Sequence, residues 1–495
     1  MKAYTLTRRE LLKGAALASA AGLLAACQPK IVEVEKVVER VVKETIIVEG
    51  TPQVVEKVVK ETVVVEKQAP VAAREPATVV WWFGWNAPAQ MEAFNTIAKN
   101  FTDMDNGITV EALQVPTMND KMLAAVAGGN PPDVGVCCIQ YTGYYARGVF
   151  TPIDDYVDAS DKIKKEDFVP GLFESMTWRG KLYGVPAAEC GPRFGFMFNL
   201  EHLEEAGLDP ENLPQTWDET WDWHTKLTKK DDAGNLAQLF LDPFFGSTTA
   251  AALAPNCASL YPESWGFKPW DGDTMTFNFD NPQMVEAFTW LKTMYDDIGV
   301  EKLDAFSQAN PGGRYVPTGA MPAGLRTAEF VGYYAPGELY VSAPDKRWVA
   351  GWCPRPESRR NIRYQNVGGH PAYIPLASKV RDQAFEFIEH LTSQESIDII
   401  FKATAWLGGR LTGYDPNRPD ISHLPALKWY LDSVNQAEEM VPGYVIPNQA
   451  FATTQYQRAV SAVQYGDKTP EQAAAELQVA VTEDLAKEFP ELLVQ

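Results

Sequence analysis

The sequence predicts an α/β fold made of two lobes, and three observations lead to this prediction. Residues 78–139 alternate strand, helix, strand, helix and strand, the order typical of a parallel sheet with right-handed crossovers. The chain has 495 residues, more than a single core of ordinary size holds. Near its middle, Trp178–Asn199 combines a turn, an extended stretch, a glycine-proline joint and an aromatic strand.

This middle stretch suits a segment that leaves one lobe and enters the other. Pro186 excludes a helix from the extended part, and the Gly191-Pro192 joint separates it from the aromatic strand. If the segment crosses between lobes, Glu189 and Arg193 lie where the lobes meet, which is where ligand clefts form. An ordinary strand–turn–strand inside one domain is the alternative.

The first elements of the α/β part can be assigned from hydrophobic periodicity. We expect strands at 79–83, 108–115 and 133–139, and helices at 89–103 and 120–126. In parallel sheets, ligands bind beyond the carboxyl ends of the strands. The residues at those ends are Trp82, Trp85 and Asn86 after the first strand, and Gln140, Tyr141 and Tyr144 after the third. Each aromatic side chain among them could instead be a core residue.

The first 27 residues predict an export signal. Arg8 and Arg9 precede the apolar run 15–26, which ends in Leu24-Ala25-Ala26-Cys27. A dozen apolar residues are too few for a permanent membrane span. The arrangement resembles a twin-arginine signal followed by a lipobox. That resemblance implies cleavage before Cys27, lipidation of its thiol, and anchoring of the exported protein on the outer face of the cytoplasmic membrane.

Residues 28–76 form a biased segment in which the stretch 43–49 returns as 60–66. Its apolar positions fit a helical stripe, although most of them are β-branched and weaken a helix. Gly50-Thr51-Pro52 divides it into two parts. We expect a stalk that holds the body away from the membrane, with a coiled coil as the alternative.

Composition limits the partners. The formal net charge is −21, so the body would repel nucleic acid and anionic lipid, and we expect no nucleic-acid partner. Apolar residues make up 45% of the chain and aromatic residues 11%, which indicates a globular protein rich in rings. Such rings suit flat, partly apolar ligands as well as cores.

Several short motifs, taken in order, resemble the extracellular solute-binding proteins of carbohydrate ABC transporters. The resemblance spans roughly residues 78–490, and its motifs lie at 128–134, 148–156, 180–186, 199–208, 214–219, 319–321, 368–370, 384–388 and 466–473. It implies a periplasmic-binding-protein-like fold, in which two α/β lobes joined by three crossover segments close on a solute by hinge motion. The chain departs from the family pattern at Leu325-Arg326, where an aromatic residue commonly approaches the sugar.

The resemblance also implies lobe boundaries and crossings. We expect the first lobe at 78–188 with about 371–415, and the second at 190–366 with about 419–495. The three crossings are expected at 185–192, 366–375 and 407–419, where glycines and prolines interrupt the regular patterns. The amphipathic helices at 282–295 and 383–391 are expected to be scaffold.

The expected function is that of a substrate-binding lipoprotein of an ABC importer. It would capture a carbohydrate, in particular an oligosaccharide, between the lobes and deliver it to permease subunits in the membrane. No cofactor, metal or enzymatic activity is expected. The candidate ligand-binding residues are Trp82, Trp85, Asn86, Tyr141, Tyr144, Glu189, Arg193, Trp265, Arg326, Trp352, Asn366, Gly369 and His370.

An enzyme is the alternative. The chain has no His-Glu-x-x-His, Gly-x-Ser-x-Gly or Cys-x-x-Cys motif. Its many acidic residues leave open a membrane-anchored, extracellular glycan-degrading enzyme with paired carboxylates, and Glu189 with Asp133 or Asp304 is the kind of pair to examine. A disulfide such as Cys190–Cys257 is conceivable in an exported protein, although no spacing selects it.

Overall fold

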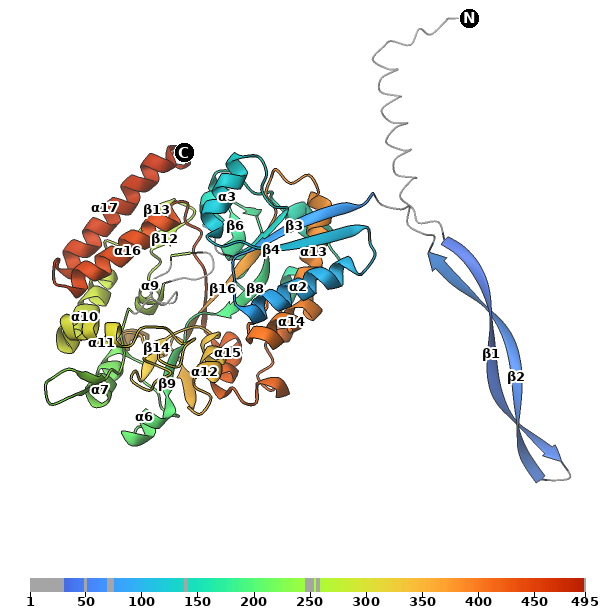
Figure 1. The fold of residues 1–495 in the computed structure, drawn as a ribbon, viewed down its shortest axis with the longest axis horizontal. Helices are drawn as coiled ribbons and strands as arrows, with labels where there is room; N and C mark the ends of the chain where they lie inside the picture. Colours follow the sequence, from blue (N-terminus) through green and yellow to red (C-terminus); the bar gives the residue numbers. More distant parts are fainter. Residues whose placement is uncertain are drawn as a thin grey trace, which may run out of the picture. The chain divides into compact units, whose positions relative to one another are not determined.

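The computed structural model describes residues 31–48, 51–68, 75–137, 141–244, 253–254 and 259–493. The chain forms two compact units, Met1–Pro76 and Ala77–Gln495 (Figure 1). The predicted export signal with Cys27 lies outside the described residues. No helix in the described ranges is long and apolar enough to span a bilayer.

The first unit contains a long β-hairpin. Strands β1 (Ile31–Val48) and β2 (Thr51–Gln68) pair antiparallel, with a register running from Val48↔Thr51 to Ile31↔Gln68. The predicted helical stripe and the coiled-coil alternative are therefore wrong, because β-branched residues favour the extended backbone over the helix. The predicted division falls between the two strands, since Val48 pairs with Thr51. A stalk function stays a prediction.

The second unit is built on a mixed six-stranded sheet (Figure 1). Strands β3 (Ala77–Phe83), β4 (Ile108–Gln114) and β5 (Val134–Val136) are parallel, as predicted. Strand β16 (Tyr364–Tyr373) pairs antiparallel with β5, and β17 (Glu439–Pro442) pairs parallel with β16. Strand β8 (Val185–Pro192) pairs antiparallel with β16.

Helices α2 (Pro88–Thr102), α3 (Met118–Ala127) and α13 (Arg381–Leu391) lie at the predicted places, and α14 (Gln394–Thr404) is a further helix of this lobe. Their common core contains Trp81, which is fully buried with its ring centroid 5.5 Å from that of Phe94 and 5.1 Å from that of Phe387. The third strand is shorter than predicted, because Cys137 has a left-handed φ of 75° that ends the extended backbone.

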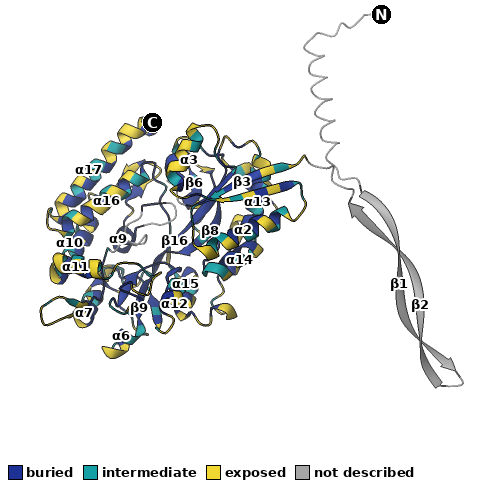
Figure 2. Cartoon of the chain, viewed as in Figure 1, coloured by how far each residue is buried: buried dark blue, intermediate teal, exposed yellow. Residues whose placement is uncertain are grey.

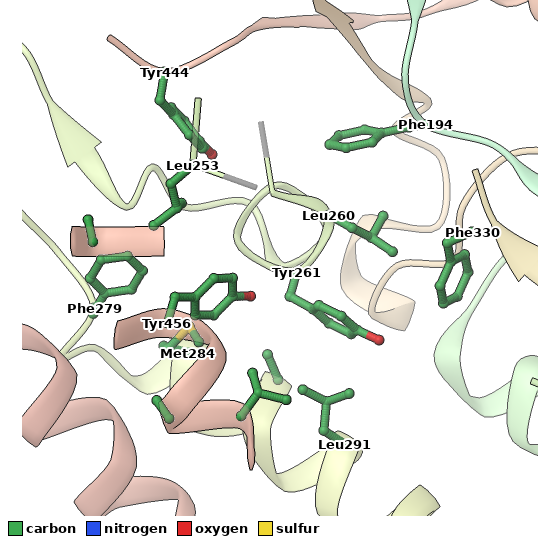
Figure 3. Packing of buried hydrophobic residues seen from close by; sticks show 14 of the residues in the cluster. Phe194, Leu253, Leu260, Tyr261, Phe279, Met284, Leu291, Phe330, Tyr444 and Tyr456 are labelled. Atoms are coloured by element: carbon green, nitrogen blue, oxygen red, sulfur yellow. The ribbon is translucent and has the colours of Figure 1, made fainter. Parts of the chain in front are cut away.

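A three-stranded antiparallel sheet forms the base of the other lobe, in the order β14 (Ala328–Phe330), β9 (Phe196–Asn199) and β15 (Trp348–Gly351). Its core gathers large rings around Tyr261 and Tyr456 (Figure 3). The surrounding helices are α6 (Leu200–Glu205), α7 (Trp217–Leu227), α9 (Leu260–Trp265), α10 (Pro282–Ile298), α11 (Val300–Ala309), α12 (Ala335–Ser342), α15 (Pro425–Gln436), α16 (Gln449–Gln464) and α17 (Pro470–Glu488).

The longer helices of this lobe are amphipathic (Figure 2). In α17 the buried side chains Ala473, Ala474, Leu477, Val481 and Leu485 recur at helical spacing, and the other side of the helix is exposed. Helix α10, which contains the predicted helix 282–295, buries Phe288 and Leu291 in the same way.

Short elements complete the unit. They are α4 (Tyr141–Ala146), α5 (Asp154–Ala159), β6 (Thr177–Trp178), β7 (Lys181–Leu182), β10 (Lys229–Lys230), β11 (Leu236–Gln238), β12 (Trp270–Asp271) and β13 (Thr276–Phe277). The 3-10 helices are η1 (Lys165–Asp167), η2 (Glu174–Met176), η3 (Glu357–Arg359), η4 (Leu411–Gly413), η5 (Pro419–Ile421) and η6 (Pro490–Leu492).

Three segments connect the two lobes, as predicted. Strand β8 leads directly toward β9, and β15 leads through residues 352–363 into β16. The third segment joins α14, which lies against α2, to α15, which lies against β15. It is tied to β8 at one residue: the Cys190 amide donates to the Leu407 carbonyl at 2.9 Å, and the Tyr414 hydroxyl donates to the Cys190 carbonyl at 2.9 Å. The residue limits drawn for each lobe stay predictions.

Candidate functional site: the interlobe cleft

A cleft with a volume of about 780 Å³ opens where β8 passes between the lobes. One wall is the loop that follows β3, Gly84–Ala87, together with Trp406. The other wall comes from the second lobe, through Gly313–Tyr315, Glu329, Tyr334 and Glu338, and Glu189 of β8 lies between the two. This volume falls within the range of small-molecule sites.

Aromatic rings form one side of the cleft. The ring centroids of Trp85 and Trp406 are 5.2 Å apart, and the edge of the His370 ring meets Trp85 with centroids 5.0 Å apart. Trp85 lies two residues beyond the carboxyl end of β3, and Trp406 follows the end of α14, where Ala405 has a left-handed φ of 57°. Each tryptophan is thus held at the end of a regular element.

Glu189 owes its position to an irregularity in β8. From Gly368↔Gly191 to His370↔Ala188 the pairing advances two residues in β16 and three in β8, so β8 carries an extra residue there. Glu189 has a φ of 51°, uncommon for a residue with a side chain. Its carboxylate accepts hydrogen bonds from Arg193 Nη1 and His370 Nε2, both at 2.8 Å.

These partners keep Glu189 ionised. Burial works to raise the pKa of Glu189, but the nearby Arg193 guanidinium and the hydrogen bond from His370 outweigh it and lower the pKa to about 2. The Tyr141 hydroxyl and His370 Nδ1 share a hydrogen bond of 2.9 Å on the other side of the ring. Tyr141, His370 and Glu189 therefore form a continuous hydrogen-bonded chain.

A second charged cluster faces this one from the other lobe. Arg314 donates from Nε to Glu338 at 2.8 Å and from Nη1 to Glu329. Glu329 is buried, and the side chains of Arg314 and Glu338 are only 11% and 9% exposed. Burial raises the pKa of Glu338, and Arg314 only partly offsets that effect. The Tyr334 ring lies between the clusters, 5.6 Å from the Arg193 guanidinium carbon and 5.4 Å from that of Arg314.

This arrangement provides rings for flat apolar faces and carboxylates for hydroxyl donors. Each guanidinium is already engaged by a carboxylate, and carboxylates outnumber guanidinium groups in the two clusters. The cleft is therefore suited to a neutral, hydroxyl-rich ligand more than to an anion. Among the described residues no cluster of His, Cys, Asp and Glu has the composition of a metal site.

Three of the residues singled out from the sequence line the cleft: Trp85, Asn86 and Glu189. Arg193, His370 and Tyr141 stand behind them, and hold Glu189 through the contacts given above. Gln140 lies outside the described residues. Six residues singled out from the sequence therefore lie together: three line the cleft, and three lie behind it and hold Glu189 in position.

The other predicted residues lie away from the cleft surface. Trp265 stacks on Trp217 with ring centroids 5.0 Å apart, in the core of the second lobe. The ring centroids of Trp352 and Trp429 are 5.3 Å apart. Arg326 is buried beside Asp242, whose pKa burial raises against the opposing charge of Arg326.

The remaining four have structural contacts of their own. Trp82 is half-buried on the opposite face of β3 from Trp81. The Tyr144 hydroxyl donates to the Asn119 carbonyl at 3.0 Å, and Asn366 Nδ2 donates to the Val441 carbonyl at 2.6 Å. Gly369 allows β8 and β16 to approach closely, because a Cβ there would be 2.2 Å from Cys190 Sγ.

The sequence analysis missed most residues of the second wall and Trp406; those with charged groups or rings are Arg314, Tyr315, Glu329, Tyr334, Glu338 and Trp406. The two glycines before Arg314, and the position of Trp406 immediately before the third crossing, were available signals. The two partners considered for Glu189 in an enzyme, Asp133 and Asp304, are not in the cleft. Asp133 accepts from the Val80 amide and from Ser378, and Asp304 accepts from Tyr465.

The cysteines correct one further expectation. Cys190 is a free, buried thiol, so the conceivable Cys190–Cys257 disulfide is wrong. Burial raises the pKa of Cys190 to about 12, which leaves it a neutral packing group between the hinge strands. Cys353 is likewise free and buried, whereas Cys137 is disulfide-bonded.

Comparison with known proteins agrees with this geometry. Residues 96–428 match the bacterial extracellular solute-binding protein family. The chain is 22% identical over 206 residues to a maltotriose-binding protein of Pyrococcus abyssi, which covers 41% of this chain and 40% of that protein. It is 24% identical over 239 residues to a lactose-binding protein of Rhizobium radiobacter, covering 48% and 51%. The chain thus spans about half or less of the length of these relatives.

Solved structures share the fold over nearly the whole second unit. CpMnBP1 with mannotriose bound aligns with a TM-score of 0.69 at 21% identity, covering 82% of this chain and 100% of that one. The sugar-binding protein MalE of Xanthomonas citri aligns with a TM-score of 0.68 at 18% identity, covering 84% and 100%. The fold is that of the periplasmic binding proteins. The chain belongs to the bacterial extracellular solute-binding protein family.

Proposed function

We propose that the protein is the substrate-binding component of an ABC importer and captures a neutral oligosaccharide in the interlobe cleft. The observation that carries this proposal is the cleft itself, with two tryptophan rings on one side and buried carboxylates on the other. Sugars present apolar ring faces and hydroxyl edges, and this lining complements both. The relatives named for maltotriose and lactose, and the mannotriose-bound structure, support the ligand class.

Within the site we assign Trp85 and Trp406 to stacking, and Asn86, Glu189, Glu329 and Glu338 to hydroxyl groups. Arg193, His370 and Tyr141 position Glu189. The lobes close on the ligand by bending at the three crossings. The closed form then docks on the permease subunits, while the lipid on Cys27 keeps the protein at the outer face of the cytoplasmic membrane.

Ligand-dependent thermal stabilisation tests this function. A panel of mannotriose, maltotriose, lactose, peptides and amino acids is screened with the processed protein. One or more neutral sugars should raise the Tm, while peptides and amino acids should not, because binding to the folded state alone stabilises it. Trp85→Ala should weaken sugar binding at least tenfold, and Trp352→Ala, outside the cleft, should leave it unchanged.

The same assay separates the alternatives. Incubation with a glycan should yield no shorter product by chromatography; product formation would support the membrane-anchored glycan-degrading enzyme instead. A protein with no response to any sugar would contradict the capture function. The anchor is tested on its own by a Cys27→Ala variant, which should be released from membranes without losing sugar binding.

A further inference from the structure

A second cavity, of about 560 Å³, lies apart from the cleft. Three separate stretches line it: the segment from Lys165 to Gly180, the segment from Glu263 to Asp273, and Val441–Val445. None of the described residues lines both this cavity and the cleft. Nothing in the proposed capture mechanism uses this space.

The cavity lies on the opposite face of the hinge from the cleft. A Cβ on Gly171 would be 2.8 Å from the Val367 side chain and 3.7 Å from Pro442, so the segment around Gly171 covers the Val367 face of β16. His370, whose ring contacts Trp85, faces the cleft. The extra residues in the β8–β16 pairing belong to β8, so side chains along β16 still alternate between its two faces. Val367 and His370 are three residues apart and therefore point to opposite faces.

Both lobes contribute to this cavity. Phe173, before β8, belongs to the buried cluster around Trp81 on the large sheet, whereas Trp178 belongs to the cluster that contains Trp270. Glu263 belongs to α9 and Trp270 to β12, both in the second lobe. Val441–Val445 connects β17, at the edge of β16, to α16. The cavity therefore bridges the lobes behind the hinge strands.

Its lining combines rings with opposite charges. Phe173, Trp178, Trp270 and Tyr444 supply aromatic surface, and all four are buried. The basic side chains Lys165, Arg179 and Lys268 are matched by the acidic Glu174, Glu263 and Asp273. A balanced lining does not select a charged ligand, whereas ring faces beside charged hydrogen-bonding groups suit a neutral molecule with many hydroxyl groups.

We propose that this cavity is a second ligand site, which binds a neutral mono- or disaccharide behind the hinge. Glu263 is its central acceptor: the side chain is buried on α9, and the Tyr444 hydroxyl donates to Oε1. The ligand stacks between the rings and donates a hydroxyl to Glu263. The site rests on its own residues, and it stands or falls independently of sugar capture in the cleft.

Glu263 gives the site a pH dependence. Burial raises the pKa of Glu263 to about 7, against the opposing effects of Tyr444 and Lys268. A hydroxyl donor binds the carboxylate better than the protonated acid, so affinity rises as the pH rises through this value. The charged or titratable groups that interact with Glu263 include Tyr444, Lys268, Arg359, Glu439 and Tyr364.

The test uses the full chain carrying Trp85→Ala, which weakens cleft binding at least tenfold, with maltose and mannobiose as probes at concentrations too low to fill the weakened cleft. Saturation-transfer NMR should detect binding of at least one probe to this variant. Adding Gly272→Phe should abolish the signal, because a Cβ at Gly272 meets only Trp270 Nε1, at 3.6 Å, and a large side chain there fills the cavity without moving the backbone. Gly272→Ala is the matched control and should retain the signal.

Titrations in the Trp85→Ala background check the role of Glu263. Affinity should fall about tenfold from pH 8 to pH 6, as Glu263 takes up its proton. Glu263→Gln should flatten this pH profile. Absence of transfer in Trp85→Ala, persistence of transfer in Trp85→Ala/Gly272→Phe, or an unchanged pH profile in Glu263→Gln overturns the proposal. Cleft binding is scored separately, as the signal lost between the wild type and Trp85→Ala.

Discussion

The two charged clusters of the cleft have opposite ratios of nitrogen donors to carboxylates. At the hinge, one carboxylate, Glu189, has two nitrogen donors, Arg193 and His370. In the second lobe, one guanidinium, Arg314, has two carboxylates, Glu329 and Glu338. The hinge cluster lowers the pKa of its acid and the other cluster leaves one of its acids with a raised pKa.

The difference shows which cluster of the cleft keeps the same charge as the pH changes. Glu189 stays ionised across the whole physiological range and offers a constant acceptor. Glu338 resists ionisation because its burial is not fully offset. A guanidinium keeps its charge in a protein, whereas a carboxylate can take up a proton. Damage to the two clusters should therefore have unequal consequences.

The largest effect is expected from Glu189→Ala. This change removes the carboxylate that lies 2.8 Å from the Arg193 guanidinium, whose side chain is 2% exposed and stays charged. Removing one partner of a buried ion pair costs roughly 3–5 kcal/mol, and Arg193 cannot relieve the cost by losing its proton. Urea unfolding monitored by circular dichroism should show this loss. Glu189→Gln, which retains an acceptor oxygen, is the control and should lose less; equal losses would mean that the charge does not matter.

A smaller and pH-dependent loss is expected from Arg314→Ala. The change leaves Glu329 and Glu338 buried together, but one of them can bind a proton and so limit the cost to roughly 1–3 kcal/mol near neutral pH. The loss should shrink at pH 5, because protonation is easier there. The same urea experiment at the two pH values measures it, and a loss independent of pH would contradict the comparison.

The smallest change in stability is expected when the pH of the wild-type protein is lowered without any substitution. The folded-state pKa of Glu189 lies below its ordinary value of 4.5, so its ionised form stabilises the fold above that value, and this contribution disappears as the pH falls toward about 2. Glu338 has the opposite sign, since its raised pKa favours the fold when it is protonated. Comparing Tm profiles of the wild type, Glu189→Gln and Glu338→Gln between neutral and acid pH separates the two. A steeper acid loss in Glu189→Gln than in the wild type would refute the assignment.

Local patterns in the sequence predicted the fold of the second unit well. The strands and helices of residues 79–136 could be predicted, because burial of one face of an element produces a hydrophobic periodicity that is visible in a short stretch of sequence. The three crossings were marked by glycine and proline. The hairpin of the first unit was missed because charges between its β-branched residues imitate a helical stripe, and register with a partner strand is not visible in a window.

The candidate site was predicted only on the side where it depends on strand ends. Trp85, Asn86 and Glu189 follow from the rule that ligands lie beyond the carboxyl ends of strands and near lobe crossings. Arg314, Glu329 and Glu338 come from a loop, a strand and a helix, and only tertiary packing brings them together. Trp265 was misplaced for a related reason: a tryptophan that packs on Trp217 in a core has no local feature that distinguishes it from one at a cleft.

The close contact between Cys190 and Gly369 gives the hinge a built-in chemical reporter. The thiol is shielded in β8, with the third crossing bonded to the backbone of the same residue. An alkylating reagent reaches the Cys190 thiol only when these strands separate. Cys353 is buried in the other lobe, and its thiol reacts only when that lobe unfolds locally. The ratio of the two labelling rates, followed by peptide mass spectrometry, thus distinguishes bending of the hinge from unfolding.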